Sequence, residues 1–300
     1  WREELLELAG RMIAASRLVT HPDGDIALFN DSALDPCPRS DDIIAYGEAL
    51  CGTFERPSAL PDSGVYSMDI GDYGYVIADF GALGPDEQMG HAPSDMFSFE
   101  LSVSGQRLFV NGGTSTYYDQ PFRQHERSAD SHNTISYPRH AQCRHWSNFR
   151  VAERTRPDDV AFSTGADDQR ILSGSLRPLG PRPRPHHTRT LTSTPAGELL
   201  LDDAISHADD GTTALFHLAP AVSVERFDEK SGNVVLSLPR GPKVYVQFSG
   251  GTVTVEDSVV SLRFNDRQRS RRLVVSVVKN SSREARLMMR LGLSDAVFGS

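Results

Sequence analysis

One block in the first half of the sequence holds most of the side chains that could carry chemistry. His91 stands near its start, Tyr117 and Tyr118 follow a glycine pair, and Arg123 and Arg127 come next. A histidine or a tyrosine can donate or accept a proton in a site tuned toward neutral pH, and a planar guanidinium pairs well with a carboxylate. This set of side chains indicates proton-transfer chemistry on an anionic substrate.

The segment that begins in this block is locally positive, although the chain as a whole carries a formal net charge of -9. Residues 123–150 contain five Arg and four His against two acidic residues. An anionic ligand would be drawn to such a segment. The alternative is a solvated loop in which Arg123 and Arg127 form ordinary salt bridges with neighbouring carboxylates such as Asp119.

The composition is that of an ordinary globular protein, with 300 residues, 38% hydrophobic and 24% charged. The negative net charge argues against a nucleic-acid surface, which needs a positive field. No apolar run approaches the roughly 20 residues that a membrane span requires, so none is predicted. Three cysteines without metal-type spacing indicate neither a disulfide framework nor a zinc cluster.

Three motifs in the block resemble those of the heparinase II/III-like family of polysaccharide lyases. Residues 90–95, Gly-His-Ala-Pro-Ser-Asp, correspond to the family's Gly-His-x-His-x-Asp. Residues 110–114, Val-Asn-Gly-Gly-Thr, correspond to Val-Asp-x-Gly-Thr, and residues 132–134 read His-Asn-Thr as in the family. The likeness extends more loosely from His21 to the strand at His187 and thus covers most of the chain.

The resemblance implies β-elimination on a uronic-acid-containing polysaccharide. A base removes the proton next to the sugar carboxylate, the charge of that carboxylate is neutralised, and an acid protonates the leaving oxygen. His91 matches the family histidine at the cleavage site, and Tyr118, or else Tyr117, is the expected acid. The expected substrate-binding residues are Arg123, Arg127, Tyr117 and Asn133. Alternatively, His91 only orders its loop, and both tyrosines pack over the sheet edge.

The metal site of the family is degenerate in this sequence. The resemblance places its zinc ligands at Pro93, Asn111 and His132, and only the histidine is unchanged. Proline has no donor atom and an amide oxygen is a poor zinc ligand, so we expect no zinc and no other cofactor. Asp95, Asn111 and His132 are expected to be structural, with Asn111 and His132 hydrogen-bonded to each other in place of the metal.

The elements around the block are mostly short strands. Apolar residues from Leu5 to Ile13 recur with helical spacing, and a second short helix is predicted over residues 41–50. From Gly64 onward, β-branched and aromatic runs bounded by turn residues predict a mainly β fold, a large antiparallel β-sandwich (supersandwich). By the resemblance, residues 1–20 end a missing N-terminal α/α toroid, 21–62 form a connector, and 63–300 form the sandwich.

The first functional hypothesis is the C-terminal domain of a bacterial lyase that acts on an anionic polysaccharide or oligosaccharide. It would be active only with its own N-terminal toroid, against which the sandwich packs. The second is a catalytically decayed carbohydrate-binding or exopolysaccharide-assembly module with the same fold. The third is a glycosidase-associated sandwich without a site of its own. The resemblance favours a periplasmic or secreted protein, and a cytoplasmic one stays open.

Overall fold

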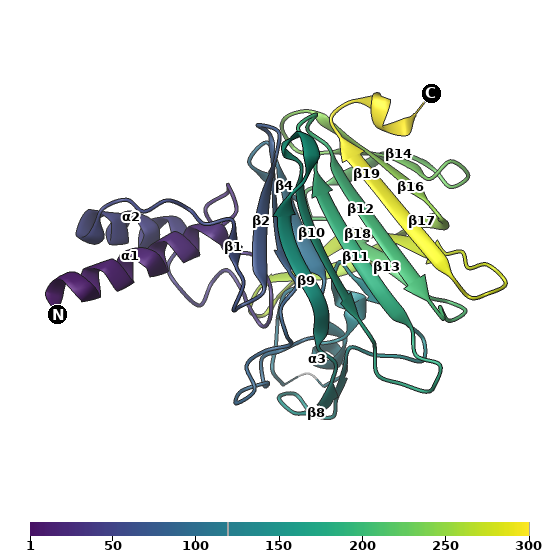
Figure 1. Ribbon diagram of the computed structural model, residues 1–300, viewed down its shortest axis with the longest axis horizontal. Helices are drawn as coiled ribbons and strands as arrows, with labels where there is room; N and C mark the ends of the chain where they lie inside the picture. The colour runs from purple at the N-terminus through teal and green to yellow at the C-terminus, as the bar shows by residue number, and fades with distance from the viewer. Residues whose placement is uncertain (119, 300) are drawn as a thin grey trace.

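The computed structural model describes residues 1–118 and 120–299 and shows a mainly β protein with a small helical layer at one side (Figure 1). Helix α1 (Arg2–Leu18) packs against α2 (Ser40–Cys51), and both stand beside the sheets. Their outer faces leave apolar side chains in solvent, among them Leu5, Met12 and Tyr46. No helix in the described part of the chain is long and apolar enough to cross a membrane.

The strands form four antiparallel sheets. The first contains β1 (Ala59–Leu60), β2 (Val65–Ile70), β3 (Gly74–Asp79), β4 (Ser98–Val103) and β5 (Gln106–Phe109), in that order. The second has the order β14 (Ser223–Asp228), β15 (Asn233–Ser237), β16 (Lys243–Ser249), β19 (Ala285–Gly292), β12 (Leu199–Ser206), β11 (His186–Ser193), β10 (Arg170–Leu176) and β9 (Pro157–Thr164). The predicted antiparallel β-sandwich is thereby confirmed.

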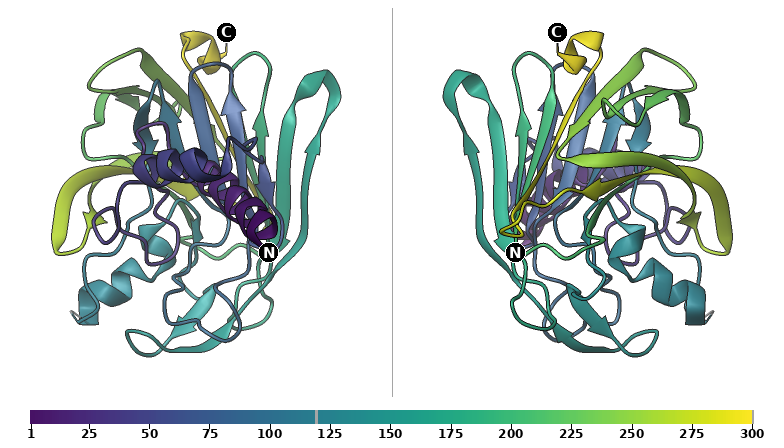
Figure 2. Two further views of the ribbon diagram at one scale, coloured as in Figure 1. Left: turned by 90° about the vertical axis from the view of Figure 1, so that its left-hand side faces the viewer. Right: turned by 90° about the vertical axis from the view of Figure 1, so that its right-hand side faces the viewer.

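Two smaller sheets and four short helices complete the fold. The third sheet has the order β17 (Gly251–Arg263), β18 (Asp266–Val277), β13 (Thr213–His217) and β6 (Ile135–Ser136), and the fourth pairs β7 (Cys143–His145) with β8 (Val151–Arg154). The short helices are α3 (Gln120–Glu126) and the 3-10 turns η1 (Ala129–Ser131), η2 (Ala166–Asp168) and η3 (Asp295–Phe298). Strands β17 and β18 make a long hairpin that curves away from the other sheets (Figure 2).

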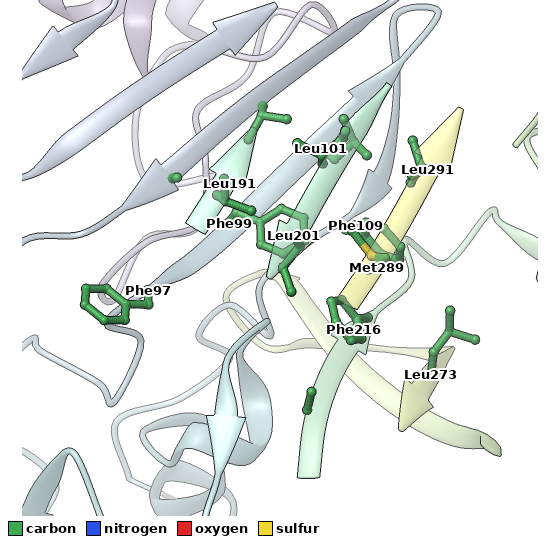
Figure 3. Packing of buried hydrophobic residues seen from close by; sticks show 14 of the residues in the cluster. Phe97, Phe99, Leu101, Phe109, Leu191, Leu201, Phe216, Leu273, Met289 and Leu291 are labelled. Carbon is green, nitrogen blue, oxygen red and sulfur yellow. The ribbon is translucent and has the colours of Figure 1, made fainter. Parts of the chain in front are cut away.

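The core lies where the sheets face one another. The rings of Phe99, Phe109 and Phe216 contact each other with centroids 5.9 to 6.2 Å apart, and they join β4, β5 and β13 (Figure 3). All three side chains are fully buried. Burying one such ring stabilises a fold by about 1.5–3 kcal/mol relative to leaving it exposed.

Alternating apolar and polar residues from Met96 to Val103, followed by Ser104-Gly105-Gln106, predict a strand and a turn. The β4–β5 hairpin confirms the turn and has a shorter first strand. Ser104 and Gly105 connect the strands, and both have positive φ, as a tight two-residue hairpin of this kind requires. Strand β4 begins at Ser98 and not at the predicted Met96, because Phe97 has a φ of 62° that is incompatible with a strand. The proline-rich residues 178–185 are the loop of the β10–β11 hairpin and therefore separate no domains.

The connector between the helices and the sheet is anchored on one buried carboxylate. Glu100 of β4 is fully buried, and its oxygens accept from His21 Nε2 at 3.0 Å and from the backbone N–H of Leu28 at 3.1 Å. They also accept from Arg107 Nη1 and from the backbone N–H of Asn111 at 2.8 Å. Because of this cover, β4 is buried on both faces although its residues alternate between apolar and polar.

Candidate functional site

The loop between β3 and β4 presents His91 to solvent. Its side chain is 51% exposed, and its Nδ1 lies 3.1 Å from Oδ2 of Asp31 and 3.4 Å from the hydroxyl of Tyr117. Since a carboxylate can only accept a hydrogen bond, Nδ1 carries the proton and Nε2 is the basic nitrogen. No described residue hydrogen-bonds that Nε2, so it is free to act as a base.

Asp31, in the connector, organises this loop site. It is almost fully buried, and both terminal nitrogens of Arg123 donate to its two oxygens, Nη1 at 2.6 Å. Thr114 donates its hydroxyl to the same carboxylate at 3.2 Å. Three segments that are far apart in the sequence therefore meet at Asp31. Asp31 was not predicted as a site residue, and the sequence signal for it was its place within the stretch of looser family likeness that begins at His21.

Tyr117, and not Tyr118, stands beside His91. The Tyr117 ring packs against Phe149 and Phe264 with centroid distances of 5.0 Å each, and against the His91 ring at 5.6 Å. Burial, followed by the charge of Asp31, raises the pKa of the Tyr117 phenol, which therefore stays protonated at neutral pH. Tyr118 is 90% exposed, and its side chain makes no contact with His91 among the described residues.

Arg123 and Arg127 are both fully buried, which corrects their expected contact with sugar carboxylates. Arg127 donates from Nη1 to the backbone oxygens of Ser147 and Asn148 at 2.8 and 2.9 Å, and from Nη2 to that of Ala92. Burial, followed by the charge of Arg123, lowers the pKa of Arg127 to about 10, so it remains charged at neutral pH. Both guanidiniums hold loops of the site in place, and neither has a free face for a ligand. Asp119, an expected salt-bridge partner, lies outside the described residues.

Asn133 is also fully buried, which corrects its expected role in substrate binding. Its Nδ2 donates to the backbone oxygens of Phe99 at 2.7 Å and Val110 at 3.1 Å, and its Oδ1 accepts from the backbone N–H of His217 at 2.7 Å. One amide side chain thus joins β4, the end of β5 and β13. The geometry supports a structural clamp at this position.

At the degenerate metal position, Asn111 and His132 form hydrogen bonds with separate protein groups. Asn111 Oδ1 accepts from the Ser98 hydroxyl at 2.5 Å, and that hydroxyl accepts from the backbone N–H of Asn133 at 3.0 Å. His132 donates a hydrogen bond from Nε2 to the backbone oxygen of Glu126 at 3.1 Å. The expected direct hydrogen bond between Asn111 and His132 is therefore wrong, because Asn111 pairs with Ser98 and His132 pairs with the backbone oxygen of Glu126.

The donor set at this position does not fit a zinc ion. Burial lowers the pKa of His132 to about 3, so it is neutral, and its Nδ1 and the Nδ2 of Asn111 have no partner among the described residues. Pro93 supplies no donor atom, and one imidazole nitrogen with one amide falls short of the usual three ligands. No group of three or more His, Cys, Asp or Glu side chains suited to a metal occurs within residues 1–118 and 120–299. The absence of zinc stays a prediction.

Two buried carboxyl groups lie behind the loop. Asp95 accepts the backbone N–H of Asn30 at 2.9 Å and so fixes the connector next to Asp31. Burial and the neighbouring Asp79 raise the pKa of Asp95 well above its usual range, and burial raises that of Asp79 to about 7. Asp79 and His91 both line a pocket of 420 Å³. The structural role of Asp95 stays a prediction.

Residues 54–287 match the family described as heparinase II/III-like, C-terminal. A heparinase III gene product has a similar structure, with a TM-score of 0.70 and 14% identity over 93% of this chain and 46% of that one. The heparan sulfate lyase HepC from Pedobacter heparinus has a TM-score of 0.70 and 16% identity, over 92% of this chain and 45% of that one. Another heparinase III has a TM-score of 0.67 and 15% identity, over 97% of this chain and 49% of that one. The chain spans less than half the length of these proteins. No curated protein sequence matches it.

Proposed function

The chain belongs to the heparinase II/III-like C-terminal family, and from that premise we propose that it supplies the β-sandwich half of a polysaccharide lyase. The proposed substrate is a uronic-acid-containing polysaccharide, cleaved by β-elimination. The observation that carries the proposal is the half-exposed His91, whose Nδ1 is held by Asp31 and whose ring lies against Tyr117. A base and an acid are thus adjacent on a rigid support, as general acid–base catalysis requires.

In the proposed reaction, His91 Nε2 takes the proton from the carbon next to the sugar carboxylate. The electron pair of that C–H bond forms a carbon–carbon double bond, and the bond from the neighbouring carbon to the glycosidic oxygen breaks. The phenol of Tyr117 gives its proton to the departing oxygen. The imidazolium and the phenolate that remain exchange their proton through solvent, which restores both groups for the next cycle.

Asp31 acts through His91 in this scheme. It fixes the tautomer that leaves Nε2 basic, and its negative charge stabilises the imidazolium that forms when His91 takes the proton. Arg123 and Thr114 hold Asp31 in turn, so the orientation of the base depends on the connector. The group that neutralises the substrate carboxylate is proposed to come from a toroid domain outside this chain.

The test is the formation of the unsaturated product, which absorbs ultraviolet light, by the complete protein on uronate polysaccharides. Tyr117→Phe should lower the rate strongly, because it removes the proton that the leaving oxygen needs, and Tyr118→Phe is the matched control that should not. A loss of rate in Tyr118→Phe alone would show that Tyr118 is the acid, as expected from the sequence. No unsaturated product from any uronate polymer would reject the lyase proposal.

A second function, a binding or assembly module without turnover, is favoured by one observation. Pro93 and Asn111 leave only His132 of the family's metal ligands, so the loop site has lost a feature that its relatives use. In that case the complete protein binds an anionic polysaccharide, and Tyr117→Phe and the wild type are equally inactive.

A further inference from the structure

A basic pocket lies between α3 and the β17–β18 hairpin, and it shares no lining residue with the pocket at His91. Its volume is 820 Å³. Figure 2 shows the hairpin curving out from the sheet with α3 below it. The positively charged side chains that line the pocket belong to β18. Its apolar side chains belong to α3 and to the segment that follows β13. Its lining includes Phe122, Pro220, Val222, Asp257, Arg269 and Arg271.

The spacing along β18 places two guanidiniums on the same face. Arg269 and Arg271 are two residues apart in a strand, so their side chains point to the same side, and both are exposed. Arg271 pairs with Asp257, its cross-strand neighbour, at 3.3 Å. That carboxylate is 98% exposed, and ion pairs so open to water are worth little. Arg271 can therefore exchange this partner for a ligand.

Arg269 has no such partner. Its cross-strand neighbour is Val259, and no carboxylate among the described residues lies within ion-pair distance of its guanidinium. In a chain with a net charge of -9, Arg269 is therefore a local positive site, because the carboxylate that lines the pocket, that of Asp257, pairs with Arg271. It offers a planar fork of donors that matches a carboxylate or a sulfate.

The walls of the pocket suit a partly apolar ligand. The guanidinium carbon of Arg267 lies 3.7 Å from the centroid of the Phe122 ring and holds that ring at the pocket. Pro220 and Val222 add apolar surface. A sugar ring has apolar C–H faces and polar edges, so an anionic sugar can place its face on these walls and its charge on Arg269.

The hairpin also connects this pocket to the loop site. Phe264, at the turn of the hairpin, packs on Tyr117 with a centroid distance of 5.0 Å. From Asp266, where β18 begins after that turn, to Arg269 the chain advances three residues, about 10 Å in a strand. A single polysaccharide chain of a few sugars is long enough to contact both places.

We propose that the pocket on β18 is a second binding site for an anionic sugar unit of a polysaccharide, with Arg269 and Arg271 as the ligands of its carboxylate or sulfate. The polymer identity rests on the proposed lyase function, but binding at this pocket does not require turnover. The site holds the polymer by one negatively charged unit while another lies at His91.

The experiment measures the dissociation constant of the complete protein for polygalacturonate, whose anions are carboxylates, and for heparin, whose anions are mostly sulfates. Dextran is the neutral reference, and the ionic strength is held constant. Arg269→Glu should weaken binding of the preferred polymer about tenfold or more, the loss expected when one hydrogen bond to a charged group is removed. The polymer that loses more affinity identifies the anion.

Arg240→Glu is the matched control. Arg240 lies in the β15–β16 turn, is exposed like Arg269, and pairs with no carboxylate among the described residues. Both substitutions therefore change the charge of the protein by the same amount. It should leave the dissociation constants within about twofold of wild type, since a remote exposed charge contributes little. Equal losses in both variants would mean general charge attraction and would overturn the proposal, as would no loss in Arg269→Glu. Equally tight, Arg269-dependent binding of duplex DNA would also overturn it.

Failure of this inference can be told apart from failure of the lyase proposal. If Tyr117→Phe lowers turnover and Arg269→Glu leaves binding unchanged, only the second site is wrong. If no uronate polymer is cleaved and Arg269→Glu still weakens binding, the second site stands and the lyase proposal falls.

Discussion

Two clusters of one histidine, one aspartate and one arginine have a similar arrangement, and they differ in their access to solvent. The site cluster is His91, Asp31 and Arg123, and the core cluster is His187, Asp203 and Arg189. In each cluster an aspartate receives two nitrogens of an arginine and one nitrogen of a histidine. The histidine of the core cluster is 1% exposed, whereas that of the site cluster is 51% exposed.

This difference in exposure separates structure from chemistry. In the core cluster, Arg189 also donates to the backbone oxygens of Phe97 and Asn133, at 2.7 and 2.6 Å, so it fixes the start of β4. Burial alone would raise the pKa of Asp203, but Arg189 and His187 outweigh it and hold that pKa well below its usual range. A buried group of this kind stabilises the fold and cannot meet a substrate. The site cluster has one nitrogen free for a reaction.

The largest effect should come from removing the exposed histidine. His91→Ala should lower the rate of unsaturated-product formation in the complete protein by about 10²- to 10⁴-fold, the usual contribution of one acid–base group. His187→Ala is the matched change in the core cluster and should lower stability while the folded fraction keeps its rate. Steady-state rates with unfolding curves for both variants check this. A fully active His91→Ala would remove the distinction between the clusters.

Removing the aspartate should cost more stability in the core cluster than in the site cluster. Asp203→Asn leaves the buried Arg189 without its counter-charge and should lower the free energy of unfolding by about 3–5 kcal/mol. Asp31→Asn should cost less stability, because Arg123 keeps the carboxyl group of Glu126 nearby, but it should also lower the rate, because His91 loses its orienting partner. Denaturant titration and rate measurements on both proteins decide the matter, and a larger stability loss in Asp31→Asn would contradict it.

A smaller, pH-dependent effect should come from histidines buried without an aspartate. Burial lowers the pKa of His132 and of His217 to about 3, from 6.5 in the unfolded chain. Between these two pKa values the unfolded chain binds a proton at each histidine and the folded protein does not. The stability that the neutral histidines contribute is therefore complete above pH 6.5 and is lost as the pH falls toward 3. In His132→Gln, the decrease in unfolding free energy between pH 7 and about 4 should be roughly 3 kcal/mol smaller than in wild type.

The comparison with wild type is needed because Asp79, whose pKa is raised to about 7 by burial, changes stability in the opposite sense over the same range. That contribution is present in both proteins and cancels in the difference. Urea unfolding at several pH values measures it. An unchanged slope in His132→Gln would show that this histidine is protonated in the folded protein.

The smallest expected effect concerns metal. The purified protein should contain well under one equivalent of zinc, and chelator treatment should not change its melting temperature, because Pro93 and Asn111 replace two ligating side chains. Elemental analysis and thermal unfolding check this. Stoichiometric zinc with His132 among its ligands would show that ligands of another kind complete the site.

The sequence was informative where a local pattern decides the outcome. Alternation in residues 98–103 and the Ser104-Gly105 turn predict the β4–β5 hairpin, since both depend on neighbours in the chain. Burial of charged residues could not be predicted in this way. Arg123 and Asn133 carry polar groups that suit a ligand equally well, and only their partners, Asp31 and backbone atoms of three different strands, show that they are structural.

The choice between adjacent residues had the same limit. Tyr117 and Tyr118 are neighbours of identical chemistry, and the rings that select Tyr117, Phe149 and Phe264, lie more than thirty positions later in the sequence. Asp31 lies 60 residues before His91, in the part of the connector between α1 and α2, where no strand is assigned. Long-range contacts of this kind leave no periodic signal.

The anchoring of the connector on Glu100 sets where the protein can be cut. The family match begins at residue 54, so a truncation at that boundary would remove His21, Leu28 and Asp31. Glu100 would then lose two hydrogen-bond donors and Arg123 its carboxylate partner, and each buried polar group left without a partner destabilises a fold by about 1–3 kcal/mol. The smallest autonomous unit therefore begins ahead of the recognised domain, within the connector.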